Sequence, residues 1–580
     1  MLGGLAKAQH IITPFEQTGG IQTPTYTAII DWWKKMDAAS PYIKMVPKGM
    51  TDAGYPLHLV LISADKDFDI ASLKKKKKAI ILINNGIHPG EPDGIDASML
   101  LARNIDGYLR HAKAKDPNPD VRWADLKLPA NVVLAIVPVY NIGGCLNRSA
   151  NFRVDQNGPE EFGSRGNSQN LDLNRDMIKC DSKDARAFVS IFRELDPDVF
   201  IDNHVSDGAD YQHVMTLLST QHNKLGPVLG PFLKNEFEPG LYARMKEKGY
   251  NLVPYVNAFG DTPESGWTEF WDSPRYTSGY GALWHTFSFV PESHMLKPYA
   301  QRVDATYKLM ESFIDFTSAN CERMLDLRRQ SRQYYQSSTQ FPLKWSLDKS
   351  QFKEVQFLGY ASGYKPSEVS GLPRLYYDRN KPFEKTVRIF NFYAEKEWVK
   401  KPQGYIIPQG WWKVIELLQQ NNVRMSRLHK DTVIRVEAYK IEDYKTAARQ
   451  YEMHHPNSEV KISASERMVQ FRKGDWYIPF NQEAGRYLLE TLEPQAEDSY
   501  FAWNYFDAIL GQKEGYSAYA FEDTAAAYVQ SHPEIKAQLD SRRAADTAFA
   551  RSAGAQLNFV YRNSPWMEPG FMQYPVYRLL

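Results

Sequence analysis

Apolar runs of strand length alternate with helical patterns over the first 330 residues of the chain. The runs occupy residues 57–62, 79–83, 131–137, 198–202 and 285–290. Continuous apolar runs of this kind are typical of strands buried on both faces. Residues 93–105 and 183–194 between them carry apolar side chains at helical spacing. Strands that alternate with helices predict an α/β fold with a mixed, mostly parallel sheet flanked by helices.

The pattern changes after about residue 330. Residues 386–393, 432–439 and 464–480 read as strands, residues 411–420 as an amphipathic helix, and residues 482–546 as helix-rich. We therefore predict a lead-in over 1–50, a main α/β domain over 51–330, and a C-terminal α+β region over 331–580 that could form two subdomains. A chain of 580 residues is also longer than one core usually supports.

Composition excludes some functions. The net charge is +1, from 70 basic and 69 acidic side chains, so we expect no nucleic-acid partner. The five consecutive lysines at 74–78 are read as a solvated lead-in to the next strand. No apolar segment reaches the ~18 residues that a membrane span requires, so we expect no transmembrane segment. The sequence indicates no oligomeric state.

The N-terminus carries an incomplete export signal. Ala6-Lys7-Ala8 before Gln9 resembles a signal-peptidase site, but residues 1–5 are too short for the apolar region that normally precedes one. We expect a periplasmic or secreted protein, with the cytoplasm as the alternative. Three cysteines are too few for a disulfide framework and do not identify the compartment.

Candidate metal ligands follow two of the buried strands. His88 and Glu91 lie on the turn after residues 79–83, and His204 follows residues 198–202. Ligands bind at the carboxyl ends of strands in open α/β sheets. If the two strands are neighbours, two imidazoles and one carboxylate meet there and leave a coordination position open, as in a catalytic zinc site.

Other strand-end and loop residues add to this set. Glu292 follows another apolar strand, where a carboxylate can act as general base and acid beside a metal-activated water. Arg165 and Arg175 lie ten positions apart on a Gly/Asn-rich loop. The planar guanidinium suits bidentate capture of a carboxylate, and a second arginine can face developing oxyanion charge.

The ordered set HPGE, DLNR, strand-end His and strand-end Glu resembles the zinc carboxypeptidase family of the carboxypeptidase A type. The resemblance covers roughly residues 50–320. It implies one Zn²⁺ per chain bound by His88, Glu91 and His204, and Glu292 as general base and acid. It also implies Asn174 and Arg175 as the pair that holds the substrate's C-terminal carboxylate.

The resemblance is less specific for two further roles. Arg165 resembles the arginine that polarises the scissile carbonyl, with Arg148 and Arg153 on the same loop as alternatives. Tyr280 is our choice for the tyrosine that closes over the substrate, with Tyr276 as the alternative. No family motif covers residues 331–580, so the resemblance assigns them no role.

These residues predict a zinc metallocarboxypeptidase that hydrolyses C-terminal amide bonds of peptides. The partner is then a peptide or peptide-like substrate with a free carboxylate. One alternative is a zinc amidohydrolase that acts on cell-wall peptides or N-acyl amino acids. A second is an inactive binding protein on a peptidase fold. Five acids are candidates for the residue that sets the preference for the substrate's side chain: Asp207, Asp210, Asp261, Glu264 and Glu269.

Overall fold

The computed structural model describes residues 11–111 and 126–580. The signal-like residues 6–8 lie outside these ranges, so export stays a prediction. None of the helices in the described ranges is long and apolar enough to cross a membrane.

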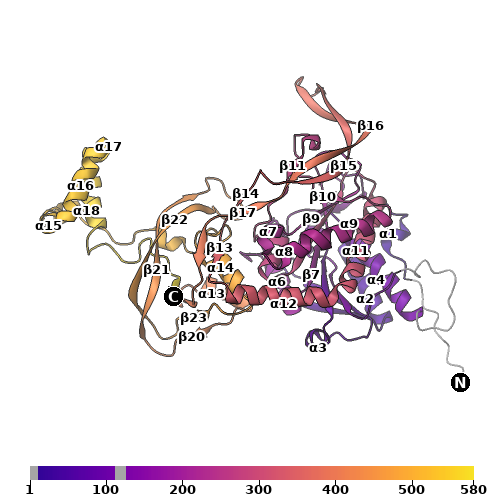
Figure 1. Cartoon of the computed structure of the whole chain (residues 1–580), viewed down its shortest axis with the longest axis horizontal. Helices are drawn as coiled ribbons and strands as arrows, with labels where there is room; N and C mark the ends of the chain where they lie inside the picture. The colour runs from indigo at the N-terminus through magenta and orange to yellow at the C-terminus, as the bar shows by residue number, and fades with distance from the viewer. Residues whose placement is uncertain (1–10, 112–125) are drawn as a thin grey trace.

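A nine-stranded mixed sheet organises the first half of the chain (Figure 1). Its order is β1 (Ile43–Met50), β2 (Pro56–Ser63), β4 (Val132–Val137), β3 (Ala79–Asn84), β7 (Val199–Asp202), β12 (Phe287–His294), β9 (Met215–Ser219) and β10 (Val253–Pro254), with β8 (His204–Ser206) also paired to β12. The central strands β4, β3, β7 and β12 run parallel, and β1, β2 and β9 add antiparallel pairs. The predicted mixed, mostly parallel sheet is confirmed.

The central strands are buried on both faces because helices cover each of them. Ile81 and Ile83 point into one core cluster, and Leu82 points into another. The first cluster includes α2 (Tyr26–Ala39), α4 (Asp93–His111), α9 (Glu238–Glu247) and α11 (Tyr299–Ala319); the second includes α6 (Lys183–Leu195) and α10 (Thr277–Leu283). Full burial of one such aliphatic side chain contributes about 1.5–3 kcal/mol, which explains the unbroken apolar runs in the sequence.

The predicted boundaries do not coincide with breaks in this core. The boundary after residue 50 falls between β1 and β2, which pair antiparallel in the same sheet, and Trp33 of the expected lead-in is fully buried in the first cluster. Residue 330 falls inside α12 (Cys321–Ser337). The expected lead-in therefore contributes a strand to the nine-stranded sheet, and the cut at 330 passes through a helix.

The C-terminal half adds sheets and helices that share a core with the first half. Its six-stranded sheet has the order β20 (Ser426–Arg427), β23 (Trp476–Pro479), β19 (Gly404–Ile407), β24 (Tyr577–Leu579), β21 (Thr432–Thr446) and β22 (Asn457–Phe471). Leu418 of α13 (Trp412–Gln420) and Leu488 of α14 (Gly485–Leu492) lie in the same apolar cluster as Phe188 of α6. The two halves are therefore packed through one continuous interior.

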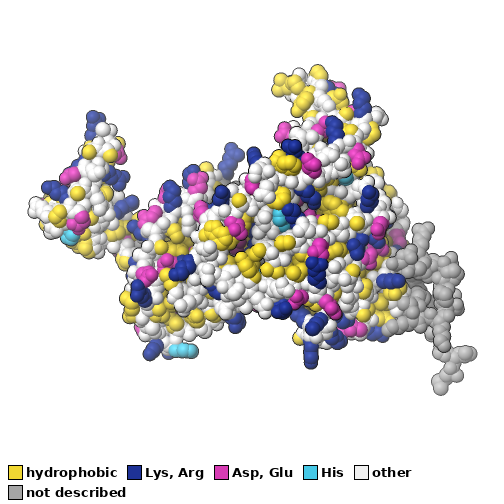
Figure 2. Space-filling view, viewed as in Figure 1, with side chains coloured by type: hydrophobic (Ala, Val, Ile, Leu, Met, Phe, Trp, Pro, Cys, Tyr) yellow, Lys and Arg dark blue, Asp and Glu magenta, His cyan; other side chains and the backbone are white. Residues whose placement is uncertain are grey.

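Two parts of the C-terminal half project from this body (Figure 1). The strands β15 (Lys353–Pro366) and β16 (Pro373–Phe390) form a long hairpin whose base pairs with β11 (Trp267–Thr268). Figure 2 shows hydrophobic side chains at the hairpin tip, where Val369 and Leu372 are exposed. The helices α15 (Ala518–Ser531), α16 (Pro533–Ala545), α17 (Thr547–Ala550) and α18 (Ala553–Arg562) form a small unit with its own core.

Candidate active site

Two of the predicted metal ligands lie on the turn between β3 and α4. The backbone N–H of Glu91 donates to the carbonyl of His88 at 2.8 Å, which closes this turn. Gly94 in the first turn of α4 lets the helix approach the end of β7, because an added Cβ would lie 2.5 Å from the Cβ of Asn203. Both ligand side chains are buried and face the pocket.

The third predicted ligand arrives from the neighbouring strand. The parallel pairing of β3 with β7 aligns Asn84 with Asp202, so His204 emerges beside the turn that carries Glu91. His204 is in turn aligned with Glu292 across β8 and β12. Sheet register alone thus brings the strand-end imidazole, the strand-end carboxylate and the turn together.

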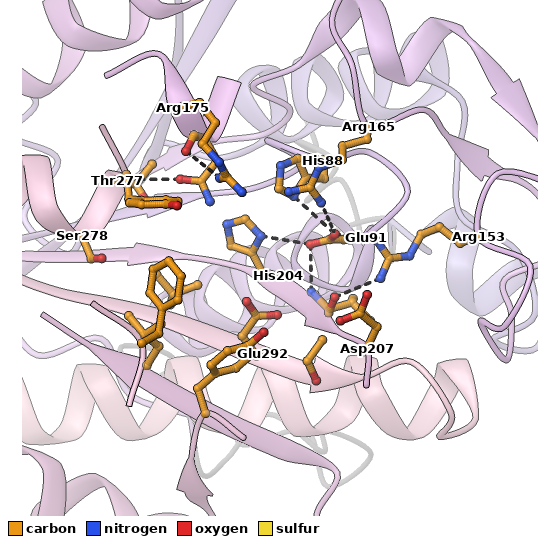
Figure 3. Close-up of a pocket in the computed structure, with 18 residues that line it drawn as sticks. His88, Glu91, Arg153, Arg165, Arg175, His204, Asp207, Thr277, Ser278 and Glu292 are labelled. Carbon is orange, nitrogen blue, oxygen red and sulfur yellow. Dashed lines mark hydrogen bonds and ion pairs between the residues drawn. The ribbon is translucent and has the colours of Figure 1, made fainter. Parts of the chain in front are cut away.

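The ligand atoms of His88, Glu91 and His204 all lie within 4.8 Å of one another, as Figure 3 illustrates. The Nδ1 atom of His204 lies 3.0 Å from Oε2 of Glu91, and the Nδ1 atom of His88 lies 3.3 Å from Oε1. Among residues 11–111 and 126–580, the buried Nδ1 atom of His88 nevertheless has no hydrogen-bond partner. Two inward nitrogens and a carboxylate are donors that Zn²⁺ accepts, so these residues fit a zinc ion.

Each histidine is held from behind by an aspartate. His88 Nε2 lies 2.9 Å from Asp172 Oδ1, and His204 Nε2 lies 3.0 Å from Asp202 Oδ2. Asp202 also accepts the hydroxyl of Thr277 at 2.7 Å. Carboxylates in this position fix the tautomer and ring orientation of metal-ligating histidines. They leave both Nδ1 atoms directed at the shared point.

Glu91 and His204 each lie next to groups of opposite charge. Burial alone would raise the pKa of Glu91, but His88 and Arg153 hold it well below its usual value. Burial would lower the pKa of His204, but Asp202 and Glu91 raise it well above the ordinary range. A metal therefore competes with a proton at His204, and its affinity falls with falling pH.

Glu292 lines the pocket and has the opposite shift. Burial raises its pKa to about 8, with a counteracting contribution from the charge of His204. A divalent cation nearby would favour the ionised carboxylate and lower this pKa. A carboxylate with a raised pKa is a better proton acceptor than an ordinary one, which suits general acid–base chemistry.

Asn174 and Arg175 both line the pocket, and Figure 3 shows Arg175 across it from Glu292. The backbone N–H of Thr277 donates to Asn174 Oδ1, and the guanidinium of Arg175 lies 4.5 Å above the ring of Tyr276. Arg175 Nη1 donates to the carbonyl of Asn174 at 2.8 Å. No acceptor for Nε or Nη2 is found within the described ranges, so one edge of the guanidinium is free for a carboxylate.

The three arginines considered for carbonyl polarisation have different surroundings. Arg148 donates to backbone carbonyls and does not line the pocket. Arg153 is fixed by bonds to Gln156, Glu91 and Val205. Arg165 lines the pocket with its side chain half-exposed and pairs with Asp172. Arg165 also lies 3.5 Å from Glu91, but at 49% exposure its side chain is more accessible than that of Arg153 at 16%.

The structure corrects the choice of Tyr280. This side chain is fully buried, donates its hydroxyl to Asn421 Oδ1 and packs on Phe192, away from the pocket. Tyr276, the alternative, lines the pocket beside Arg175. Of the two tyrosines considered, Tyr276 is thus the one that lines the pocket.

The pocket has a volume of about 300 Å³. Apolar and aromatic side chains contribute much of the wall beyond the metal ligands: Leu218, Tyr255, Phe270, Tyr276 and Val290. Among the five acids considered for side-chain preference, only Asp207 lines the pocket. Asp210 pairs with Arg379, and Glu264 pairs with Lys385.

Comparisons with known proteins give weak matches only. No model of a protein family matches the sequence, and no curated protein matches it. One solved structure that matches is a metallo-carboxypeptidase from Burkholderia cenocepacia, with 15% identity over 51% of this chain and 68% of that chain and a TM-score of 0.35. Another is carboxypeptidase A from Helicoverpa armigera, with 14% identity over 52% of this chain and 74% of that chain and a TM-score of 0.36. A third is a metallo-carboxypeptidase from Pseudomonas aeruginosa in complex with (2-guanidinoethylmercapto)succinic acid (13%, 51% and 68%, 0.35). Likeness at this level decides neither the fold nor the activity of this chain.

Sequence reasoning missed three residues that the structure places around the ligands. Asp172 and Asp202 hold the histidines, and Arg153 binds Glu91. Asp172 opens the DLNR segment and Asp202 precedes His204 by two positions, so the pairing of carboxylates with imidazoles was a usable signal. Arg153 had been considered only for another role.

We expect Asp202→Asn to weaken zinc binding by about 10–100-fold. The two oxygens of Asp202 accept from Asn84 Nδ2 and from His204 Nε2, and an amide has only one oxygen to serve both donors. Competition with a fluorescent chelator measures the dissociation constant. Asp443→Asn is the matched control, since Asp443 is exposed on β21 and pairs with Lys461 there. Unchanged zinc affinity in Asp202→Asn would show that this carboxylate does not support the metal site.

Proposed function

We propose that this protein is a zinc-dependent carboxypeptidase that removes C-terminal residues from peptides. The observation that supports it best is one pocket lined at one side by His88, Glu91 and His204 and at the other by the free guanidinium edge of Arg175. A hydrolytic centre at a fixed distance from a carboxylate anchor selects the terminal amide bond.

Each of the pocket residues has a separate role in the proposed reaction. Asn174 and Arg175 hold the substrate carboxylate and so orient the scissile bond. Arg165 faces the carbonyl oxygen, where negative charge develops. Glu292 takes a proton from the attacking water and then passes it to the departing amine. When bound, Zn²⁺ would polarise the carbonyl and lower the pKa of a water from ~15.7 toward ~7.

We further propose that the side chain of the released residue is apolar. Leu218, Phe270 and Val290 contribute apolar surface to the pocket, and burial of an apolar side chain against such a wall is favourable. Asp207 is exposed at the pocket, so it does not form a closed site for a basic side chain.

The test uses the purified full chain with one equivalent of zinc. We expect release of single C-terminal residues from peptides that end in Phe or Leu, and loss of release when the terminal carboxylate is amidated. Chelation should abolish activity and zinc should restore it. Mass spectrometry of the products measures each result.

Two outcomes would contradict the proposal. Internal cleavage, or equal rates on free and amidated peptides, would show that the carboxylate anchor does not select the bond. Turnover of muropeptides or N-acyl amino acids, with none of linear peptides, would identify the zinc amidohydrolase instead.

A further inference from the structure

A turn from the C-terminal half contacts the loop that carries Asn174 and Arg175. The connection between β21 and β22 forms the turn Tyr451–His454. Glu452 Oε2 accepts the backbone N–H of Asp172 at 3.0 Å, and His454 Nε2 lies 2.9 Å from Asp181 Oδ2. These contacts join positions 280 and 273 residues apart in the sequence.

The backbone of this turn is held in an unfavourable conformation. Glu452 has φ +48° and Met453 has φ +68°, a left-handed region that residues with a Cβ avoid. Tyr451 and His454 exchange two backbone hydrogen bonds, of 2.7 and 3.0 Å, across the turn. The ring of Tyr451 is also stacked on Trp503. Unfavourable backbone persists only where the surroundings fix it, and here it presents Glu452 to the loop.

Asp172 connects that contact to both ends of the pocket. Its carboxylate holds His88 Nε2 and accepts the backbone N–H of Asn174, each at 2.9 Å, and it pairs with Arg165 at 2.9 Å. A shift of Asp172 would therefore affect both the orientation of His88 and the position of Asn174.

We propose that the Tyr451–His454 turn is a positioning element of the active site, with Glu452 as the positioning residue. This inference rests on the proposed function, because it assigns the turn to the substrate carboxylate. The charge-assisted bond from the Asp172 N–H to Glu452 fixes the start of the loop 172–175. Without it the loop gains freedom, and Arg175 meets the carboxylate in fewer of its conformations.

The C-terminal half thereby has a function in catalysis without touching substrate. Lys179 extends the same support, since its buried ammonium binds Asp176 and Asp181 at 2.9 and 2.8 Å. Tyr505 from the C-terminal half donates its hydroxyl to the Lys179 carbonyl at 2.6 Å. The loop is thus held at Asp172 and again just beyond Arg175.

The test compares three variants in the full-length protein. Glu452→Ala removes the acceptor, Glu452→Gln keeps a neutral one, and Glu466→Ala is the control, since Glu466 lies exposed on β22 and pairs with Arg435. We expect Glu452→Ala to raise KM for a free-carboxylate peptide about tenfold with kcat within about threefold. We expect Glu452→Gln to restore KM to within about threefold of the unmodified protein.

Hydrogen–deuterium exchange gives a readout that needs no substrate. The amides of residues 172–176 should exchange faster in Glu452→Ala than in Glu466→Ala, at unchanged melting temperature. His454→Ala is a second variant and should act in the same direction. Unchanged exchange and unchanged KM in both turn variants would overturn the inference. If the unmodified protein released no C-terminal residue, the proposed function would fail, while faster exchange would still support the turn's hold on the loop.

Discussion

Glu292→Gln is expected to lower kcat by about 10²–10⁴-fold while the protein still binds zinc. The same carboxyl both accepts and returns the proton, and the amide can do neither. The substitution keeps the side-chain volume. Because burial raises the pKa of Glu292 to about 8, the site disfavours the charged form, so loss of that charge should not lower the melting temperature. Single-turnover kinetics and a zinc titration on the same sample measure both results.

A matched control separates catalysis from the mere removal of a buried acid. Glu311 on α11 also has a pKa raised by burial, but it does not line the pocket. Glu311→Gln should retain full turnover. If Glu292→Gln hydrolysed peptides at the unmodified rate with zinc bound, the assignment of Glu292 as general base and acid would be wrong.

The meeting of the candidate metal ligands was predictable because it depends on local strand signals and on which strands are neighbours. The apolar runs before His88 and His204 identify two buried strands, and parallel strands end at the same edge of a sheet. The only step the sequence left open was whether those strands are neighbours. The observed pairing of β3 with β7 supplies it.

The choice of Tyr280 overlooked the helical spacing of the aromatic residues around it. Tyr280 and Trp284 are four positions apart, which places both on one face of a helix, and the structure packs that face into the core. Tyr276 precedes the first residue of α10 and so remains free to face the pocket. The four-residue spacing of the two aromatic side chains was the available signal.

The contact between Glu452 and the loop at Asp172 could not be predicted from the sequence. Glu452 is one acid among many in a hairpin connection, and its partner is a backbone N–H that carries no sequence signature. Register and turn geometry, rather than residue type, decide that contact. Long-range contacts of this kind require the three-dimensional arrangement of both sheets.

Arg175→Ala is expected to lower kcat/KM for free-carboxylate peptides by about 10²–10³-fold, since loss of one partner from a hydrogen-bonded charge pair costs about 2–5 kcal/mol. The rate on amidated peptides should change little, so the ratio between the two substrates should fall toward one. Arg175→Lys keeps the charge but loses the planar fork, and it should give an intermediate ratio. Steady-state kinetics on matched free and amidated peptides measure this ratio.

Arg427 is the control for removal of an arginine that lies over an aromatic ring. Its guanidinium is 4.4 Å from the Trp476 ring centre, much as Arg175 lies 4.5 Å from that of Tyr276, but Arg427 lies on β20 and does not line the pocket. Arg427→Ala should leave the ratio of the two substrates unchanged. If Arg175→Ala slowed free and amidated peptides equally, the arginine would support the fold of the pocket rather than bind the carboxylate, and the selection of terminal bonds would need another anchor.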